Sequence, residues 1–135
     1  MEKKYLTLNE AENLIPKLQS SIIKVQDLAK AISILDSIEL EMTDHFDEIV
    51  NEIRMNKSFY KLNYSFFKEL EELFKRGAII KDIKGGIVDF YSIYDGREIF
   101  LCWKTGEKDI KYWHEVFTGF EARKPIALLR KKTDN

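Results

Sequence analysis

The stretch that decides the fold reads Ile87-Val88-Asp89-Phe90-Tyr91-Ser92-Ile93-Tyr94-Asp95-Gly96-Arg97-Glu98-Ile99-Phe100-Leu101-Cys102-Trp103-Lys104. Both halves of this stretch are rich in β-branched and aromatic residues, which favour strands. The Asp95-Gly96 pair between them is the strongest short-range signal for a two-residue hairpin turn. The sequence therefore predicts two antiparallel strands over 87–94 and 97–104.

A two-residue turn also predicts which residues of the two strands face each other. Tyr94 must pair with Arg97, and counting outward brings Asp89 opposite Cys102. Facing side chains lie on the same side of a sheet, about 4.5–5.5 Å apart at Cβ. The only cysteine of the chain is therefore expected beside a carboxylate. A three-residue turn would shift the register by one residue and remove this pair.

The two faces of the predicted hairpin differ in polarity. One face is apolar and is formed by Val88, Phe90, Leu101 and Trp103. We expect this face to pack on helices, because an antiparallel sheet commonly buries one side only. The opposite face, with Asp89 and Cys102, is then partly open or covered by the C-terminal segment.

Before the hairpin the chain changes character, because none of its 6 glycines precedes Gly77. Residues 1–77 are therefore expected to be helical, and residues 78–135 to form strands and turns and to end in a basic tail. Thr7-Leu8-Asn9-Glu10 fits a capping box that begins the first helix. Apolar residues then recur in steps of three and four up to Ile32, the seam of a coiled coil. Pro16 lies within this helix and is expected to bend it rather than break it.

A second helix is predicted to end at about Arg76, with Gly77 as its cap. Residues 54–58 are predicted to form a loop, with Ser58 capping that helix, and whether 36–58 form one helix or two is left open. Further strands are predicted at 78–80 and 110–117. The expected fold is α+β: a single domain over 1–135, with a long N-terminal antiparallel helical hairpin of coiled-coil character and then a small antiparallel β-meander.

Composition limits the classes of function. The 135 residues include 22 Lys and Arg against 23 Asp and Glu, a net charge of −1. This balance does not favour nucleic-acid binding, although five basic residues lie near the C-terminus: Arg123, Lys124, Arg130, Lys131 and Lys132. There is no apolar run of about 20 residues and no signal-peptide core, so we expect a soluble cytoplasmic protein with no membrane partner. A single cysteine excludes an intrachain disulfide and zinc sites that need two thiolates.

The second part of the chain contains a series of short motifs: Gly86-Ile87-Val88-Asp89-Phe90, Asp95-Gly96-Arg97, Leu101-Cys102-Trp103, Gly106-Glu107, Tyr112-Trp113-His114-Glu115 and Gly119-Phe120 to Arg123. Together with the opening residues Tyr5, Thr7, Glu10-Ala11, Leu14 and Pro16, this series resembles an uncharacterised prokaryotic family catalogued as domain of unknown function 2203. The resemblance covers nearly the whole chain and is least at about 36–58. It implies no known activity, so the site must be argued from its chemistry.

Four residues of the meander offer metal ligands of mixed type: Asp89, Cys102, Glu107 and His114. Oxygen, sulfur and nitrogen donors together suit a borderline divalent metal such as zinc, or iron. With three ligands and one open position, the metal could activate a water. Glu107, His114 or Glu115 would then be candidates for the acid or base of a hydrolase. A cysteine hydrolase, in which His114 ionises Cys102, is disfavoured because Asp89 would raise the pKa of the thiol.

The alternative for the same residues is a structural polar network. Its further members would be Arg97, Trp103, Trp113, Glu115 and Arg123. In such a network the side chains saturate one another, and Arg97 is predicted to pair with Asp89 or Glu107.

A second polar cluster consists of Glu41, Asp44, His45 and Glu48. Its spacing does not match the Glu-x-x-His step of a di-iron site, so we interpret it as a solvated helix face. A basic partner could dock there, including the chain's own basic tail within a dimer.

The function that these features favour most is a non-enzymatic interaction or assembly module. We expect a homodimer through the N-terminal helices, because an apolar seam longer than its partner helix tends to self-associate. The polar β-face would bind a protein partner or a small ligand. The alternative is a metal-dependent enzyme centred on Asp89, Cys102, Glu107 and His114.

Overall fold

The computed structural model describes residues 2–36, 45–127 and 129 and shows an α+β fold. The helices come first: α1 (Leu8–Glu12), α2 (Ile15–Asp36) and α3 (His45–Arg76). A sheet of five antiparallel strands follows: β1 (Ala78–Asp82), β2 (Ile87–Tyr94), β3 (Arg97–Lys104), β4 (Tyr112–Glu115) and β5 (Lys124–Pro125), with a short 3-10 helix, η1 (Phe120–Ala122), between the last two. The strands are adjacent in chain order, so the sheet is a meander. No helix among the described residues is long and apolar enough to span a membrane.

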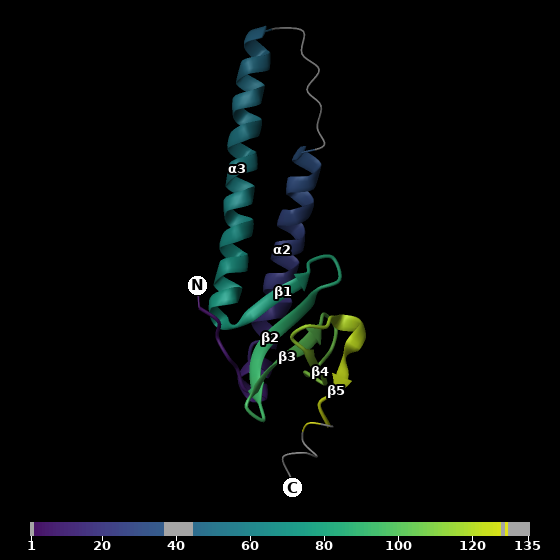
Figure 1. Ribbon diagram of the computed structural model, residues 1–135. Helices are drawn as coiled ribbons and strands as arrows, with labels where there is room; N and C mark the ends of the chain where they lie inside the picture. The colour runs from purple at the N-terminus through teal and green to yellow at the C-terminus, as the bar shows by residue number, and fades with distance from the viewer. Residues whose placement is uncertain (1, 37–44, 128, 130–135) are drawn as a thin grey trace.

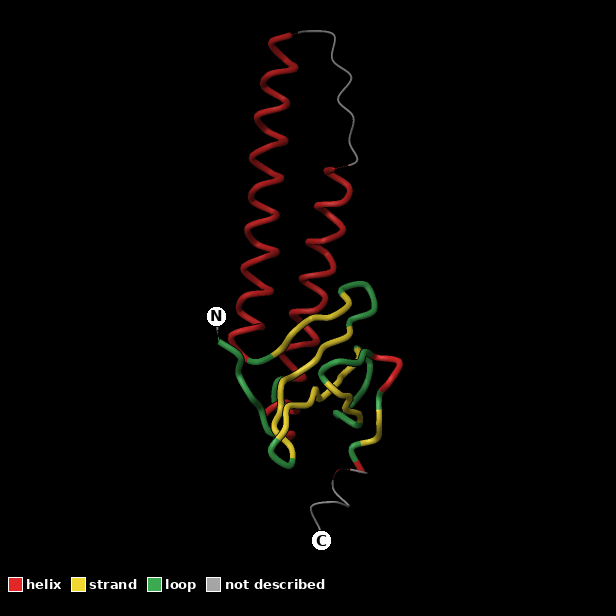
Figure 2. The backbone as a smooth tube through the Cα atoms, viewed as in Figure 1, coloured by secondary structure: helices red, strands yellow, loops and turns green. Residues whose placement is uncertain are grey.

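The sheet lies beside one end of the long helices, and α3 extends well beyond it (Figure 1). α2 and α3 lie side by side and run in opposite directions, and Lys24 Nζ of α2 is 3.2 Å from Glu69 Oε2 of α3. Figure 2 shows that the strands gather at the end of α3 where the helix leads into β1. The molecule therefore consists of a β-containing end and a projecting helical arm.

The start of the chain confirms the predicted capping box but not the predicted long first helix. Glu10 N donates to Thr7 Oγ1 at 3.2 Å, and Thr7 N donates to Glu10 Oε1 at 3.0 Å. α1 then ends at Glu12 and α2 begins at Ile15, so the expectation of one bent helix was wrong. In a continuous helix the Pro16 ring would clash with the carbonyl group of Glu12. The interruption instead places Pro16 in the first turn of α2, where a missing amide hydrogen costs little.

The predicted loop at 54–58 was also wrong, because α3 is continuous from His45 to Arg76. Polar residues in this segment are compatible with helix: Arg54 and Ser58 are exposed on the helix surface, while Met55 is half-buried. Whether 36–58 form one helix or two was left open. Residues 45–58 belong to one helix, α3, and residues 37–44 lie outside the described residues. At the other end, Gly77 caps α3 with φ +100°, as predicted.

The hairpin has the predicted register. Tyr94 pairs with Arg97 and Asp89 pairs with Cys102. Asp95 and Gly96 have φ values of 52° and 76°, the two positive angles of a type I′ turn. The remaining strands differ from the prediction in length, since β1 extends to Asp82 and β4 covers only Tyr112–Glu115. β4 ends early because Thr118 N donates to the Glu115 carbonyl at 3.0 Å and turns the chain.

The core lies between the apolar face of the sheet and the first two helices. All four predicted residues of that face are buried: Val88, Phe90, Leu101 and Trp103. They belong to the same buried cluster as Leu18 and Ile22 of α2 and Ala11 of α1. The prediction that this face packs on helices is therefore confirmed, and the Asp89 side chain lies on the opposite face of the sheet.

Candidate functional site

Three neighbouring strands bring together an aspartate, a cysteine and a histidine. Asp89 of β2 faces Cys102 of β3, and His114 of β4 faces Phe100, two residues before Cys102. Side chains two residues apart in a strand share a face, so all three point to the same side of the sheet. One ligand atom from each lies within 4.8 Å of the other two. We call this group the Asp-Cys-His cluster.

The Asp-Cys-His cluster is closed to solvent. The exposed fractions are 3% for Asp89, 0% for Cys102 and 1% for His114. The face was expected to be either partly open or covered by the C-terminal segment, and these three side chains are covered. Part of the cover is aromatic, because the Phe100 ring lies 5.4 Å from the His114 ring and 4.5 Å from the Tyr91 ring.

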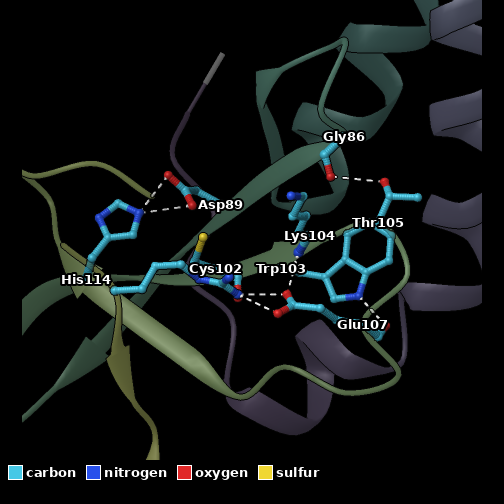
Figure 3. A network of polar contacts seen from close by, with 9 residues as sticks. Gly86, Asp89, Cys102, Trp103, Lys104, Thr105, Glu107 and His114 are labelled. Atoms are coloured by element: carbon cyan, nitrogen blue, oxygen red, sulfur yellow. Dashed lines mark hydrogen bonds and ion pairs between the residues drawn. The ribbon is translucent and has the colours of Figure 1, made fainter. Parts of the chain in front are cut away.

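The His114 ring is held by acceptors at both nitrogens. Its Nε2 atom lies 3.0 and 3.1 Å from the two carboxylate oxygens of Asp89 (Figure 3). Its Nδ1 atom lies 2.8 Å from the Glu115 carbonyl oxygen, which can only accept, so Nδ1 carries a hydrogen and donates it. A neutral imidazole has one N–H group, which leaves the Nε2 lone pair aimed at a carboxylate. Nε2 and the two Asp89 oxygens are then all acceptors, so a proton or a metal ion must lie between them.

Cys102 is in the form of a thiol that resists ionisation. Burial raises its pKa to about 12, and the charge of Asp89 and a hydrogen bond with that carboxylate act in the same direction. The sequence predicted the effect of Asp89 but not the larger effect of burial. A thiol of this kind is a poor nucleophile in the absence of a metal.

Glu107 is not a member of the cluster, in contrast to the prediction. Arg123 Nη2 donates to both of its carboxylate oxygens, at 2.7 and 3.0 Å, and the Lys104 amide donates to Oε1 at 2.6 Å. The same Nη2 group also lies 3.3 Å from the Cys102 carbonyl oxygen. Trp103 Nε1 donates to the Glu107 carbonyl at 2.8 Å. Glu107, Arg123 and Trp103 therefore form a polar network beside the cluster. Figure 3 labels Glu107 and Trp103 of this network together with Cys102.

Arg97 was predicted to pair with Asp89 or Glu107, and this prediction was wrong. Arg97 Nη1 instead lies 3.0 Å from Glu115 Oε1. The hairpin register explains the difference, because Arg97 points to the face opposite Asp89. Glu115 points to the same face as Arg97, so its carboxylate is not placed to serve as a base at His114. The Trp113 ring lies beneath Arg97, 5.7 Å from the guanidinium carbon to the ring centre.

Two contributors to the site were not predicted. The Glu115 carbonyl group orients His114, and the Thr118 hydroxyl donates to that carbonyl at 3.0 Å and lies 3.4 Å from His114 Nδ1. A backbone acceptor leaves no signal in the residue types. Thr118 could have been noticed only through its position four residues after His114 in a predicted turn.

The second polar cluster of the sequence is only partly described. Glu48 is exposed and His45 begins α3, whereas Glu41 and Asp44 lie outside the described residues. The basic residues Arg130, Lys131 and Lys132 also lie outside them. Of the remaining basic residues near the C-terminus, Arg123 belongs to the network with Glu107, and Lys124 lies over the Trp113 ring at 4.9 Å.

The fold and the site define a small α+β protein with a buried Asp-Cys-His cluster on one face of its sheet. A family model described as an uncharacterized conserved protein (DUF2203) matches residues 4–126. The chain therefore belongs to this family, which confirms the resemblance noted from its motifs. No curated protein and no solved structure matches the chain.

Proposed function

We propose that this protein is a non-enzymatic assembly module that forms a homodimer through the outer face of α3. The observation that carries the proposal is a row of apolar side chains on that face: Ile53, Tyr60, Tyr64 and Phe67. These side chains are between 50% and 71% exposed, which is unusual for four large apolar groups on one side of a helix. We call this row the α3 stripe.

The α3 stripe is distinct from the side of the helix that contributes to the interior. Phe59, Phe66 and Leu73 are half-buried or buried. At about 3.6 residues per turn they fall on a different side of the helix from Tyr60 and Phe67. The stripe is therefore a second apolar face, and α2 does not cover it.

The spacing of the stripe suits a second copy of the chain. Ile53, Tyr60 and Phe67 are seven residues apart, the repeat of residues that meet across a coiled coil. If Ile53, Tyr60 and Phe67 are assigned to heptad position a, Glu52 is at position g and Lys57 is at position e. In a parallel pair, position g of one helix lies beside position e of the other helix, five residues further along. Each copy would then place its Glu52 next to the partner's Lys57, so charge complementarity supports a parallel, self-complementary interface.

The burial of the Asp-Cys-His cluster also supports a non-enzymatic role. A hydrolase substrate must reach the reacting groups, and none of the three side chains is more than 3% exposed. The metal-dependent hydrolase is therefore not the function we propose.

We place the module in the cytoplasm, where a free thiol such as Cys102 stays reduced.

The first test is the mass of the protein in solution as a function of concentration. We expect sedimentation equilibrium to give a dimer for the unaltered chain and a monomer for Tyr60→Glu, which places a charge within the stripe. Ser58→Glu is the matched control, because it adds the same charge to the exposed surface of α3 about 200° around the helix. A monomeric unaltered chain, or equal dissociation of both variants, would contradict the proposal.

The orientation of the pair is tested by disulfide cross-linking. In a parallel pair, residue 53 lies beside residue 53 and residue 67 beside residue 67, so Ile53→Cys and Phe67→Cys should each form covalent dimers on mild oxidation. An antiparallel pair centred on Tyr60 would instead cross-link only a mixture of the two variants. Cys102 does not compete, because it is fully buried.

A further inference from the structure

We propose that Asp89, Cys102 and His114 form a buried binding site for one divalent metal ion of the zinc type. This site is independent of the α3 stripe, and it requires no substrate to reach it. Its role would be structural, since one ion held by three residues would link β2, β3 and β4.

The orientation of His114 is the first support for a metal site. A histidine that ligates a metal almost always donates its other ring N–H to a carboxylate, a backbone carbonyl or water, which orients the ligating nitrogen. His114 has this arrangement: Nδ1 donates to the Glu115 carbonyl at 2.8 Å, and Nε2 faces the cluster. Thr118 secures the same carbonyl oxygen with its hydroxyl group at 3.0 Å.

The need for a positive charge is the second support. A buried carboxylate is costly unless a cation compensates it. The nearby Arg123 does not serve Asp89, because its Nη2 group binds both oxygens of Glu107. Lys81 lies over the Phe100 ring at 4.7 Å and Lys3 is 3.4 Å from Glu98, so neither is paired with Asp89. Among the described residues, none of these three basic side chains is therefore paired with Asp89, and the carboxylate is left as a candidate ligand for a bound cation.

The donor set is the third support, and it selects the type of metal. Zinc binds sulfur at about 2.3 Å and nitrogen or oxygen at about 2.0–2.2 Å, so tetrahedral ligand atoms lie roughly 3.3–3.6 Å apart. The Asp89 oxygens are already 3.0 and 3.1 Å from His114 Nε2, and the whole set lies within 4.8 Å. Small side-chain rotations would therefore suffice. A sulfur donor disfavours magnesium and calcium and favours zinc, cobalt or ferrous iron.

The experiment uses the full chain after treatment with a chelator, and the probes are Zn²⁺ and Co²⁺. We expect one Co²⁺ per chain with the charge-transfer absorption of a cobalt–thiolate bond, and displacement of Co²⁺ by Zn²⁺. Saturating Zn²⁺ should raise the melting temperature by at least about 5 °C, because the ion binds only the folded chain.

Variants separate the three ligands from the neighbouring network. Cys102→Ser should abolish the thiolate absorption, and His114→Gln should weaken Co²⁺ binding by more than the roughly 10–100-fold that loss of an outer-shell partner costs. Glu107→Gln is the matched control, because Glu107 is an acidic residue beside the cluster but not in it, and it should retain one Co²⁺ per chain. Circular dichroism shows which variants are folded.

If a variant does not fold, the measurements on the unaltered chain alone decide whether the metal site exists. No cobalt–thiolate absorption and no effect of Zn²⁺ on the melting temperature would overturn the proposal and leave a buried hydrogen-bonded pair of His114 and Asp89. Loss of binding in Glu107→Gln with its fold intact would also overturn the three-residue site. Neither result bears on dimerisation through the α3 stripe.

Discussion

At the scale of single residues, the sheet sorts two acidic side chains into two different environments. Asp89 is buried with a thiol and an imidazole, whereas Glu107 forms a two-oxygen ion pair with Arg123. Arg123 Nη2 donates to both oxygens of Glu107, and the Lys104 amide donates to Oε1, so this carboxylate has charged and backbone donors of its own. Asp89 has His114 Nε2 as a side-chain partner, which makes Asp89 rather than Glu107 the acidic ligand of the metal site proposed above.

The reactivity of Cys102 can be predicted at the same scale. In chelator-treated folded protein, a pKa of about 12 leaves only about one thiol in 10⁵ ionised at neutral pH. We expect iodoacetamide to label Cys102 at least a hundred-fold more slowly than the exposed added thiol of the Ser58→Cys variant. The same reagent should label both at similar rates in denaturant. Rapid labelling of Cys102 in the folded chain would show that the cluster opens.

At the scale of elements, turns and caps are determined by the backbone angles they require. The Asp95-Gly96 turn needs two positive φ angles, and Gly86 before β2 also has a positive φ, of +64°. The two glycines differ in their surroundings. A Cβ atom on Gly96 would meet nothing within 4 Å, whereas one on Gly86 would lie 2.0 Å from Thr105 Oγ1.

This difference predicts unequal effects of the same substitution. Gly96→Ala should lower the free energy of unfolding by about 1–2 kcal/mol, the cost of a positive φ for a residue with a Cβ atom. Gly86→Ala should cost about 1–3 kcal/mol more, because the added atom also displaces Thr105. Urea denaturation of both variants measures the difference. Equal losses of stability would mean that the Thr105 side chain can move away from the added Cβ atom at no cost in free energy.

At the scale of the whole molecule, the packed β-containing end contrasts with the helical arm. The buried cluster of the core draws on α1, α2 and the sheet, and from α3 it includes Leu73, close to the end of that helix. The farther part of α3 carries the stripe and extends beyond the sheet (Figure 1). An arm of this kind gains stability when a second helix covers its apolar side.

The stability of the arm should therefore depend on protein concentration. If two copies pair through the stripe, mass action raises the melting temperature as the concentration rises. We expect such a rise for the unaltered chain and for Ser58→Glu, and none for Tyr60→Glu. Differential scanning calorimetry over a hundred-fold range of concentration measures it. A melting temperature that does not change in any of the three would argue against an obligate pair.

The features that the sequence determined by itself are those that depend on neighbours along the chain. The Asp95-Gly96 turn, the pairing of Asp89 with Cys102 and the Thr7 capping box were all predicted, because each follows from a few consecutive residues and the two-residue period of a strand. Membership of the family was likewise visible in its motifs.

What only the tertiary structure decided depends on groups distant along the chain. The sequence predicted Arg97 as the partner of Asp89 or Glu107, whereas the path of the chain through η1 brings Arg123 to Glu107. His114 took its orientation from a backbone carbonyl, which no residue type reveals. α3 continues through 54–58, although few apolar residues occur there. Helix formation is cooperative, so the helical residues on both sides extend the helix through this segment. The sequence thus determined the local pairings, while long-range packing decided which polar groups share a site.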